Sequence, residues 1–254
     1  MLVKSLLCQT TITVLVLAPI SLAGPAYAVD ETAWQRSVTA NQVVLVTARS
    51  TSSTSATLRT FARQGSDWVL VQQPIPVFLG RSGLIPAQSR KQSSGTTPMG
   101  TFNLTSAFGR SANPGAQLPY VRVDRNDAWT YNPKVPSTYN LFQSATRSWK
   151  SYGNKYVEHL WALGPQYDYV VVTDFNKPPG EVYTTPGGVN RTSSPADTKR
   201  GGGIFLHVSK GIPTVGCISM AKNVMRSMLT WLDPKARPVV IIGLEKTLMK
   251  SMTP

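Results

Sequence analysis

The sequence predicts a mainly-β domain built from many short strands joined by turns. The 254 residues include 19 Gly and 19 Pro spread along the chain, and both residue types mark turns and interrupt helices. Between them lie short apolar runs rich in β-branched residues, which is the pattern of strands. No internal repeat and no long low-complexity tract divides the sequence. A single strand-rich domain therefore fits the chain best.

The first 28 residues have the pattern of a secretory signal peptide. Lys4 precedes an apolar stretch over residues 12–20, and Ala26-Tyr27-Ala28 has the small-x-small form that signal peptidases cut. A membrane anchor is the alternative, but the stretch is short for a bilayer span. We therefore expect export with cleavage after Ala28, and no stable membrane insertion afterwards.

Cleavage would leave 226 of the 254 residues, enough to bury one core without a disulfide. We expect a lead-in over residues 29–41, one domain over 42–243 and a tail over 244–254. The mature chain would keep only Cys217 of the two cysteines. In an oxidising compartment, where paired cysteines are the norm, a lone thiol is expected to be buried or used.

The charge of the chain points to an anionic partner. Without Lys4, 25 of the 26 basic residues remain against 12 acidic ones, a net charge of +13. The basic residues are scattered and form no run interleaved with aromatics, which argues against nucleic acid. For an exported protein, we expect an anionic cell-wall polymer as the partner.

Apolar runs predict the strands of the first third of the chain. Residues 43–46, 56–61 and 68–71 predict three strands, and the turn at 64–67 makes a hairpin of the last two. Residues 74–79 contain two prolines, which cannot donate to a central ladder. This segment is therefore expected to be an edge strand or an entering segment.

The middle of the chain is less regular. Residues 97–104 predict a turn followed by a short strand, and 169–173 predict a buried strand. Residues 105–160 are poorly periodic and contain six aromatics between positions 120 and 149, so we expect a long insertion packed on the core by its rings. Residues 177–203 predict a long polar loop, either a substrate-covering loop or a mobile surface loop.

The last third combines the clearest strand with the clearest helix. Residues 204–208 predict a strand that carries His207, and a turn follows over 209–216. Cys217 is then expected just before a helix capped by Ser219. A closing strand follows at 239–242. The apolar stripe of the helix, interpreted as core, consists of Val224, Met225, Met228, Leu229 and Leu232.

Cys217 and His207 are candidates for nucleophilic catalysis. At a helix N-terminus, the macrodipole and nearby amides would lower the pKa of the Cys217 thiol. A histidine on an adjacent strand could take the thiol proton and later return it to an amine. Gly216 would let substrate approach closely, and the amides from Gly216 to Ile218 could donate to an oxyanion.

A structural interpretation of both residues stays open, because a buried cysteine is often a small hydrophobe and a lone histidine is often a packing residue. A metal site is not expected, since His159 is the only other histidine and no ligand cluster has the required spacing. We interpret His159, on an expected short helix, as a surface or packing residue.

Two segments resemble the signature of YkuD-type L,D-transpeptidases. In this family a His-bearing strand, here residues 204–207, is followed by Ser/Thr-x-Gly-Cys and an aliphatic residue, here 214–218. Residues 97–102 resemble the Thr-Pro-x-Gly-x-Phe segment of the same family. The resemblance spans about residues 42–243. Ser219 stands where many members carry an arginine.

The resemblance implies a β-sandwich catalytic domain with a few short helices that cross-links peptidoglycan stem peptides. It assigns Cys217 as the nucleophile and His207 as the base, and it places Thr214, Gly216 and Ile218 at the motif positions around them. No cofactor and no metal are implied. The protein would act in the bacterial cell wall, the periplasm or the extracellular space.

Two alternatives to transfer remain open. Water could resolve the same acyl-enzyme, which would make the protein an L,D-carboxypeptidase or amidohydrolase. A non-catalytic cell-wall-binding module with an unused thiol would also fit the high charge.

Overall fold

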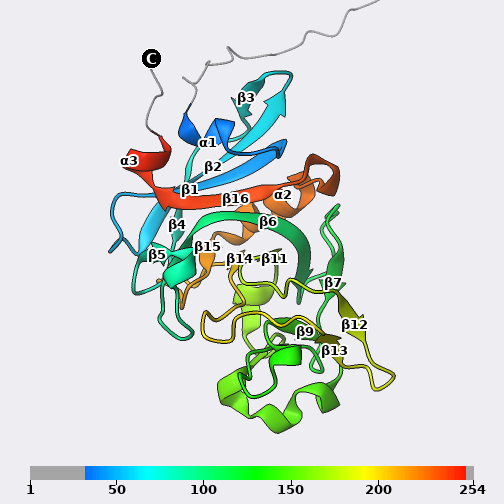
Figure 1. Cartoon of the computed structure of the whole chain (residues 1–254). Coiled ribbons are helices and arrows are strands. Elements are labelled where there is room, and N and C mark those ends of the chain that lie inside the picture. Colours follow the sequence, from blue (N-terminus) through cyan, green and yellow to red (C-terminus); the bar gives the residue numbers. More distant parts are fainter. Residues whose placement is uncertain (1–31, 250–254) are drawn as a thin grey trace, which may run out of the picture.

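A computed structural model describes residues 32–249, and strands dominate it (Figure 1). The expected signal peptide over 1–28 lies outside the described residues, as do residues 250–254 of the expected tail. Within the described part, no helix has the length and apolar character needed to cross a membrane.

Eight strands form one continuous sheet that closes on itself, because β2 pairs with both β4 and β1. In order around the ring they are β1 (Gln42–Ala48), β16 (Val239–Leu244), β6 (Thr97–Gly109), β11 (Val170–Thr173), β14 (Phe205–Val208), β15 (Ile218–Met220), β4 (Ile75–Phe78) and β2 (Ser55–Gln64). Three more strands attach to it: β3 (Asp67–Leu70) on β2, and β5 (Leu84–Pro86) and β7 (Tyr120–Arg122) on β6.

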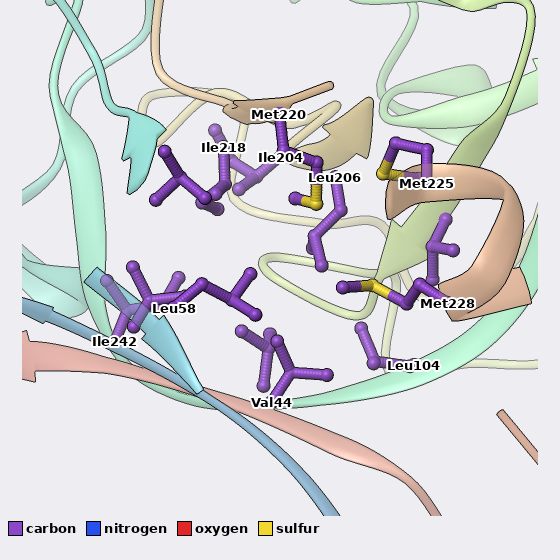
Figure 2. Packing of buried hydrophobic residues seen from close by; sticks show 14 of the residues in the cluster. Val44, Leu58, Leu104, Ile204, Leu206, Ile218, Met220, Met225, Met228 and Ile242 are labelled. Carbon is purple, nitrogen blue, oxygen red and sulfur yellow. The ribbon is translucent and has the colours of Figure 1, made fainter. Parts of the chain in front are cut away.

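The main core lies between opposite sides of this ring (Figure 2). Val44, Leu58 and Ile242 point toward Leu206 and Ile218 from the facing strands. All five side chains are buried, and burial of each contributes roughly 1.5 to 3 kcal/mol to stability. Two facing layers around one core confirm the expected β-sandwich with few short helices.

Helix α2 (Lys222–Trp231) covers one end of this core. Met225, Met228 and Leu229 of its apolar stripe are buried, as is Leu232 just beyond the helix, so their interpretation as core residues is confirmed. Val224 is partly buried and packs against the same cluster. The helix is amphipathic, and its apolar face fixes its place on the sheet.

Both expected flanks of the domain contribute to a second apolar cluster. Short helix α1 (Ala33–Arg36) brings Trp34 against Phe61 and Trp68, with ring centroids 5.0 and 5.1 Å apart. The expected tail begins as helix α3 (Glu245–Leu248), which packs on the same cluster through its last residue. Residues 32–41 of the lead-in and 244–249 of the expected tail therefore belong to the folded unit.

The expected hairpin of β2 and β3 is confirmed, with Gln64 opposite Asp67. Strand β4 has the edge character expected of this segment over most of its length, because it pairs with β2 along its length but with β15 only at Phe78. Pro76 pairs only with Thr57 of β2. Its missing N–H is therefore tolerated, since no ladder bond is required on its other side.

Strand β6 is much longer than the expected short strand near 97–104. Its 13 residues run to Gly109, and its second half pairs with β11 on one side and β7 on the other. Ser106 and Ala107 are weak strand formers, but β11 pairs with both and β7 also pairs with Ala107, which holds the segment extended.

The insertion after β6 forms its own three-stranded sheet of β8 (Ala128–Thr130), β9 (Leu141–Gln143) and β10 (Val157–His159). Trp129 packs against Phe108 and Phe205, so the expected packing of the insertion by its rings is confirmed. His159 lies on a strand and not on the expected short helix, because β10 pairs with β8. Short 3-10 turns complete the fold at Ala87–Ser89, Pro136–Thr138, Thr146–Ser148, Lys150–Tyr152, Asn154–Tyr156, Gly164–Tyr167 and Pro234–Ala236.

The expected long loop over 177–203 contains a small hairpin of β12 (Val182–Thr184) and β13 (Asn190–Thr192). Asn190 is tied to β9 by three hydrogen bonds involving Gln143 and Phe142. The loop is thus fastened to the insertion before the chain enters β14 through Gly201 to Gly203.

We expect Trp34→Ala to lower the free energy of unfolding by about 3 to 5 kcal/mol, because it empties a buried aromatic site. Urea denaturation of the mature protein measures this loss. Tyr183→Ala is the control: its ring is half exposed, so a change of about 0.5 kcal/mol or less is expected. Equal midpoints for Trp34→Ala and wild type would show that the lead-in is no part of the cooperative unit.

Candidate active site

Cys217 and His207 line the same cavity, which has a volume of about 890 Å³. Thr214 and Ser219 line it as well, whereas Ile218 points into the main core and is fully buried. The cavity is large enough for a peptide-sized ligand. Three parts of the chain form it: the loop before β6, the insertion around β10, and the β14–β15 unit.

Parallel pairing of β14 with β15 sets the positions of both candidates. His207 lies opposite Ser219, and the Phe205 amide donates to the Cys217 Sγ atom at 3.4 Å. Alternation along β14 sends Phe205 and His207 to the cavity side and Leu206 to the core. The strands therefore bring the thiol and the imidazole to one face of the sheet.

The prediction that Cys217 lies at the N-terminus of a helix was wrong. Residues 218–220 are extended in β15, Ser219 belongs to that strand, and α2 starts at Lys222 after an N-cap at Ala221. The apolar residues on either side of Ser219 pack into the core, and the pairing with β14 keeps the segment extended. The Cys217 thiol consequently receives no stabilisation from a helix macrodipole, which acts only within the first turn.

The Cys217 thiol is buried and protonated at neutral pH. It donates to the Gly203 carbonyl oxygen at 3.3 Å and accepts from the Phe205 amide. Burial raises the pKa of the thiol to about 12, and the negative charge of Glu158 acts in the same direction. The Phe205 amide and the Arg90 charge lower this pKa by less.

The His207 imidazole is buried and neutral. Its Nδ1 atom lies 2.9 Å from the Val208 carbonyl oxygen, which can only accept, so Nδ1 carries the proton and Nε2 keeps its lone pair. Burial lowers the pKa of His207 to about 4, and the charge of Lys210 lowers it further. The ring also meets Tyr167 edge-on at 5.5 Å.

The Cys217 thiol and the His207 imidazole each bond to backbone groups and not to each other. Their shifted pKa values leave both side chains neutral in the resting site. An unprotonated imidazole at neutral pH can accept a proton. A buried thiol must lose its proton at the moment of attack. The arrangement can therefore support base-assisted nucleophilic attack once a substrate displaces the thiol from Gly203.

Thr214 and Gly216 shape the turn that leads to the thiol. The Thr214 hydroxyl donates to the Cys217 carbonyl oxygen at 2.7 Å and accepts from the Gly216 amide at 3.0 Å. In this state the Gly216 amide is therefore engaged within the turn. Gly216 has φ +143°, and a Cβ there would lie 2.9 Å from Arg90 Nη2, so a larger residue would be strained and crowded.

Arg90 is a residue of the site that the sequence did not indicate. Its side chain is buried, donates from Nε to Thr96 O at 2.9 Å and from Nη1 to Arg200 O at 2.8 Å, and reaches Gly216 with Nη2. It places a positive charge close enough to lower the pKa of the Cys217 thiol. No signal in the polar stretch around Arg90 indicated this contact, because it depends on tertiary packing.

Glu158 is the second residue that the sequence did not indicate. Its carboxylate accepts from the Tyr131 hydroxyl at 2.8 Å and from the Tyr167 hydroxyl at 2.6 Å. Burial raises the pKa of Glu158, and the two hydroxyls oppose this. Tyr167 also lines the cavity.

Residues 32–249 contain no cluster of three His, Cys, Asp or Glu side chains that could hold a metal.

A comparison with protein families gives one match to the chain. The family model of the L,D-transpeptidase catalytic domain, YkuD, matches residues 50–241. This range covers most of the described chain and includes both His207 and Cys217. No curated protein and no solved structure matches the chain.

Acid should destabilise the protein partly through His207. The pKa of His207 is lower in the folded protein than in the unfolded chain. The contribution of this histidine to the free energy of unfolding is therefore complete above about pH 6.5 and is lost as the pH falls toward 4. Between pH 7 and 4 the wild type should lose roughly 3 kcal/mol more unfolding free energy than His207→Gln. Urea denaturation at both pH values measures this, with His159→Gln as the matched control. Equal losses in wild type and His207→Gln would contradict the expectation.

The Cys217 thiol of the free protein should react slowly at neutral pH. Because burial raises its pKa to about 12, the alkylation rate with iodoacetamide should still be rising at pH 10. Mass spectrometry of the labelled protein follows the rate, and a urea-unfolded sample gives the rate of the unperturbed thiol. A rate that levels off below pH 7 would reveal a preformed thiolate.

Proposed function

The chain belongs to the family of the L,D-transpeptidase catalytic domain, and on this basis we propose that it transfers the acyl group of a peptidoglycan stem peptide to an amine through Cys217. The observation that carries the proposal is the presence of the Cys217 thiol and an unprotonated His207 in one cavity. Family membership supplies the stem peptide as substrate. The cavity volume of about 890 Å³ is compatible with a peptide of this size.

Acylation begins when the substrate carbonyl displaces the thiol from the Gly203 oxygen. The thiol proton passes to Nε2 of His207, and Sγ attacks the carbonyl carbon before the terminal D-residue. As the tetrahedral adduct collapses, the bond to the D-residue nitrogen breaks, and His207 returns the proton to that amine. The product of this half-reaction is a thioester on Cys217.

In the second half-reaction Cys217 is the leaving group and His207 again transfers a proton. An acceptor amine attacks the thioester carbon, the carbon–sulfur bond breaks with its electron pair on Sγ, and His207 carries a proton from the amine to the sulfur. A new amide is formed and the neutral thiol is restored. The same residues serve both halves because His207 is uncharged at the start of each.

Ser219 is suited to assist at the carbonyl oxygen. Its hydroxyl is buried, lines the cavity opposite His207, and has no hydrogen-bond partner among the described residues. A buried hydroxyl without a partner costs free energy unless a ligand satisfies it. We therefore assign Ser219 as a donor to bound substrate.

The basic surface and the expected signal peptide support a role outside the cytoplasm. A charge of +13 on the mature chain would hold the enzyme near anionic polymers of the cell wall and speed its encounter with them. We accordingly place the protein in the bacterial cell wall, the periplasm or the extracellular space.

We expect a carbapenem, a β-lactam that can acylate cysteine, to form a covalent adduct with the mature protein. Intact-mass spectrometry should show one adduct in wild type and none in Cys217→Ala. In His207→Ala, the adduct should form about 10²- to 10⁴-fold more slowly, which is the range of general-base contributions to rate. Ser209→Ala, outside the cavity lining, serves as the control.

The absence of an adduct on fully reduced wild-type thiol would contradict the proposal and favour a non-catalytic wall-binding module. An adduct that forms equally fast in His207→Ala would remove the imidazole from the mechanism. Transfer and hydrolysis share this first step, so the products formed from a stem peptide distinguish them.

A further inference from the structure

Glu158 lies on the cavity wall with two hydroxyl donors and no cation. Its Oε2 and Oε1 atoms accept from Tyr131 and Tyr167, respectively. Among residues 32–249 no basic side chain forms an ion pair with it. A carboxylate has about four acceptor positions, so these two bonds leave part of its capacity unused. A partly buried carboxylate in this state attracts a cationic ligand.

Short contacts connect this carboxylate to the reacting sulfur. The Tyr131 hydroxyl lies against Gly203, where an added Cβ would overlap it. The Gly203 carbonyl oxygen in turn accepts from the Cys217 thiol at 3.3 Å. The charge of Glu158 is also felt at Cys217, where it disfavours the thiolate. Glu158 therefore stands beside the reaction centre and works against the first half-reaction.

Because Glu158 hinders formation of the Cys217 thiolate, any contribution that it makes to the reaction must lie in a different step. Acylation creates negative charge on sulfur, which a neighbouring carboxylate opposes. The second half-reaction brings in an amine, which is an ammonium ion in water at neutral pH. This incoming ammonium has the charge that the Glu158 carboxylate stabilises.

We propose that Glu158, held by Tyr131 and Tyr167, binds the ammonium group of the acceptor amine next to the Cys217 thioester. The inference rests on the proposed function and adds to it a residue that positions the acceptor, a primary amine on a stem-peptide side chain. Charge-assisted hydrogen bonds to the carboxylate would orient the nitrogen, and water lacks the charge to compete for this position. The residue would thus favour transfer over hydrolysis.

The proton balance of the step involves Glu158 and His207 in turn. The bound ammonium gives one proton to the Glu158 carboxylate, which leaves a neutral amine. The amine nitrogen then attacks the thioester carbon, the carbon–sulfur bond breaks, and His207 moves a second proton from nitrogen to sulfur. Glu158 later releases its proton to solvent. Burial, which raises the pKa of this carboxyl, makes it a better acceptor for the first proton.

A structural role for the same contacts predicts a different result. Glu158 joins the insertion to Tyr167 near β11, so it could serve only to hold these segments together. Loss of such a support would disturb the cavity and impair both half-reactions. The proposed role concerns the second half-reaction alone.

Glu158→Gln separates the two roles. The mature protein is supplied with a donor stem tetrapeptide and a soluble stem peptide that carries a free side-chain amine, and mass spectrometry quantifies amide and hydrolysis products. The variant should acylate at least as fast as wild type, because a charge that opposes the thiolate is gone. Its ratio of amide to hydrolysis product should fall by at least about tenfold, since the charged partner of the ammonium is removed. Glu245→Gln, on α3 and with a side chain that is 45% exposed, is the matched control.

An unchanged product ratio in Glu158→Gln would overturn the inference while leaving the acyl-enzyme intact. A lack of acylation in wild type would refute the proposed function itself. If Glu158→Gln does not fold, Glu158→Asp decides, because it keeps the charge but withdraws the carboxylate by one methylene from the place where the ammonium would bind. A lower transfer share with normal acylation supports the amine site, and an unchanged share contradicts it.

Discussion

Parallel pairing between β14 and β15 is the constraint on which the site depends. The pairing sets His207 opposite Ser219 and brings the Phe205 amide to the Cys217 sulfur, so two short strands define one wall of the cavity. Their alternate residues, such as Leu206, extend into the core between the two sides of the closed sheet. Packing that stabilises the fold therefore also fixes the functional side chains.

Burial determines the electrostatic state of the resting site. The same desolvation raises the pKa of the Cys217 thiol and lowers that of the His207 imidazole, so both groups are neutral when no substrate is bound. Charge must then arise during the reaction, on sulfur and on the carbonyl oxygen. A neutral, buried Cys217 thiol oxidises slowly, since the thiolate is the form that oxidises. Arg90 and Glu158, with opposite effects on the thiol, tune this balance.

The sequence predicted the strands that are apolar along their length, such as 43–46 and 204–208, because their own residues favour extended structure. It failed where partners decide the conformation: β6 continues beyond Leu104 because β7 and β11 hold it, and Ser219 is extended because β14 pairs with its segment. The pair of Cys217 and His207 could be proposed from motif residues. Arg90 and Glu158 could not, because only the packing of distant segments brings them to the cavity.

The most direct test of the account uses a stem tetrapeptide that ends in a D-residue and follows the mature protein by intact-mass spectrometry. We predict release of the D-residue together with a mass gain on Cys217 equal to the remaining acyl group, and loss of both in Cys217→Ala. Release that persists in Cys217→Ala, or no acylation of a reduced wild-type thiol, would contradict a thioester mechanism at this site.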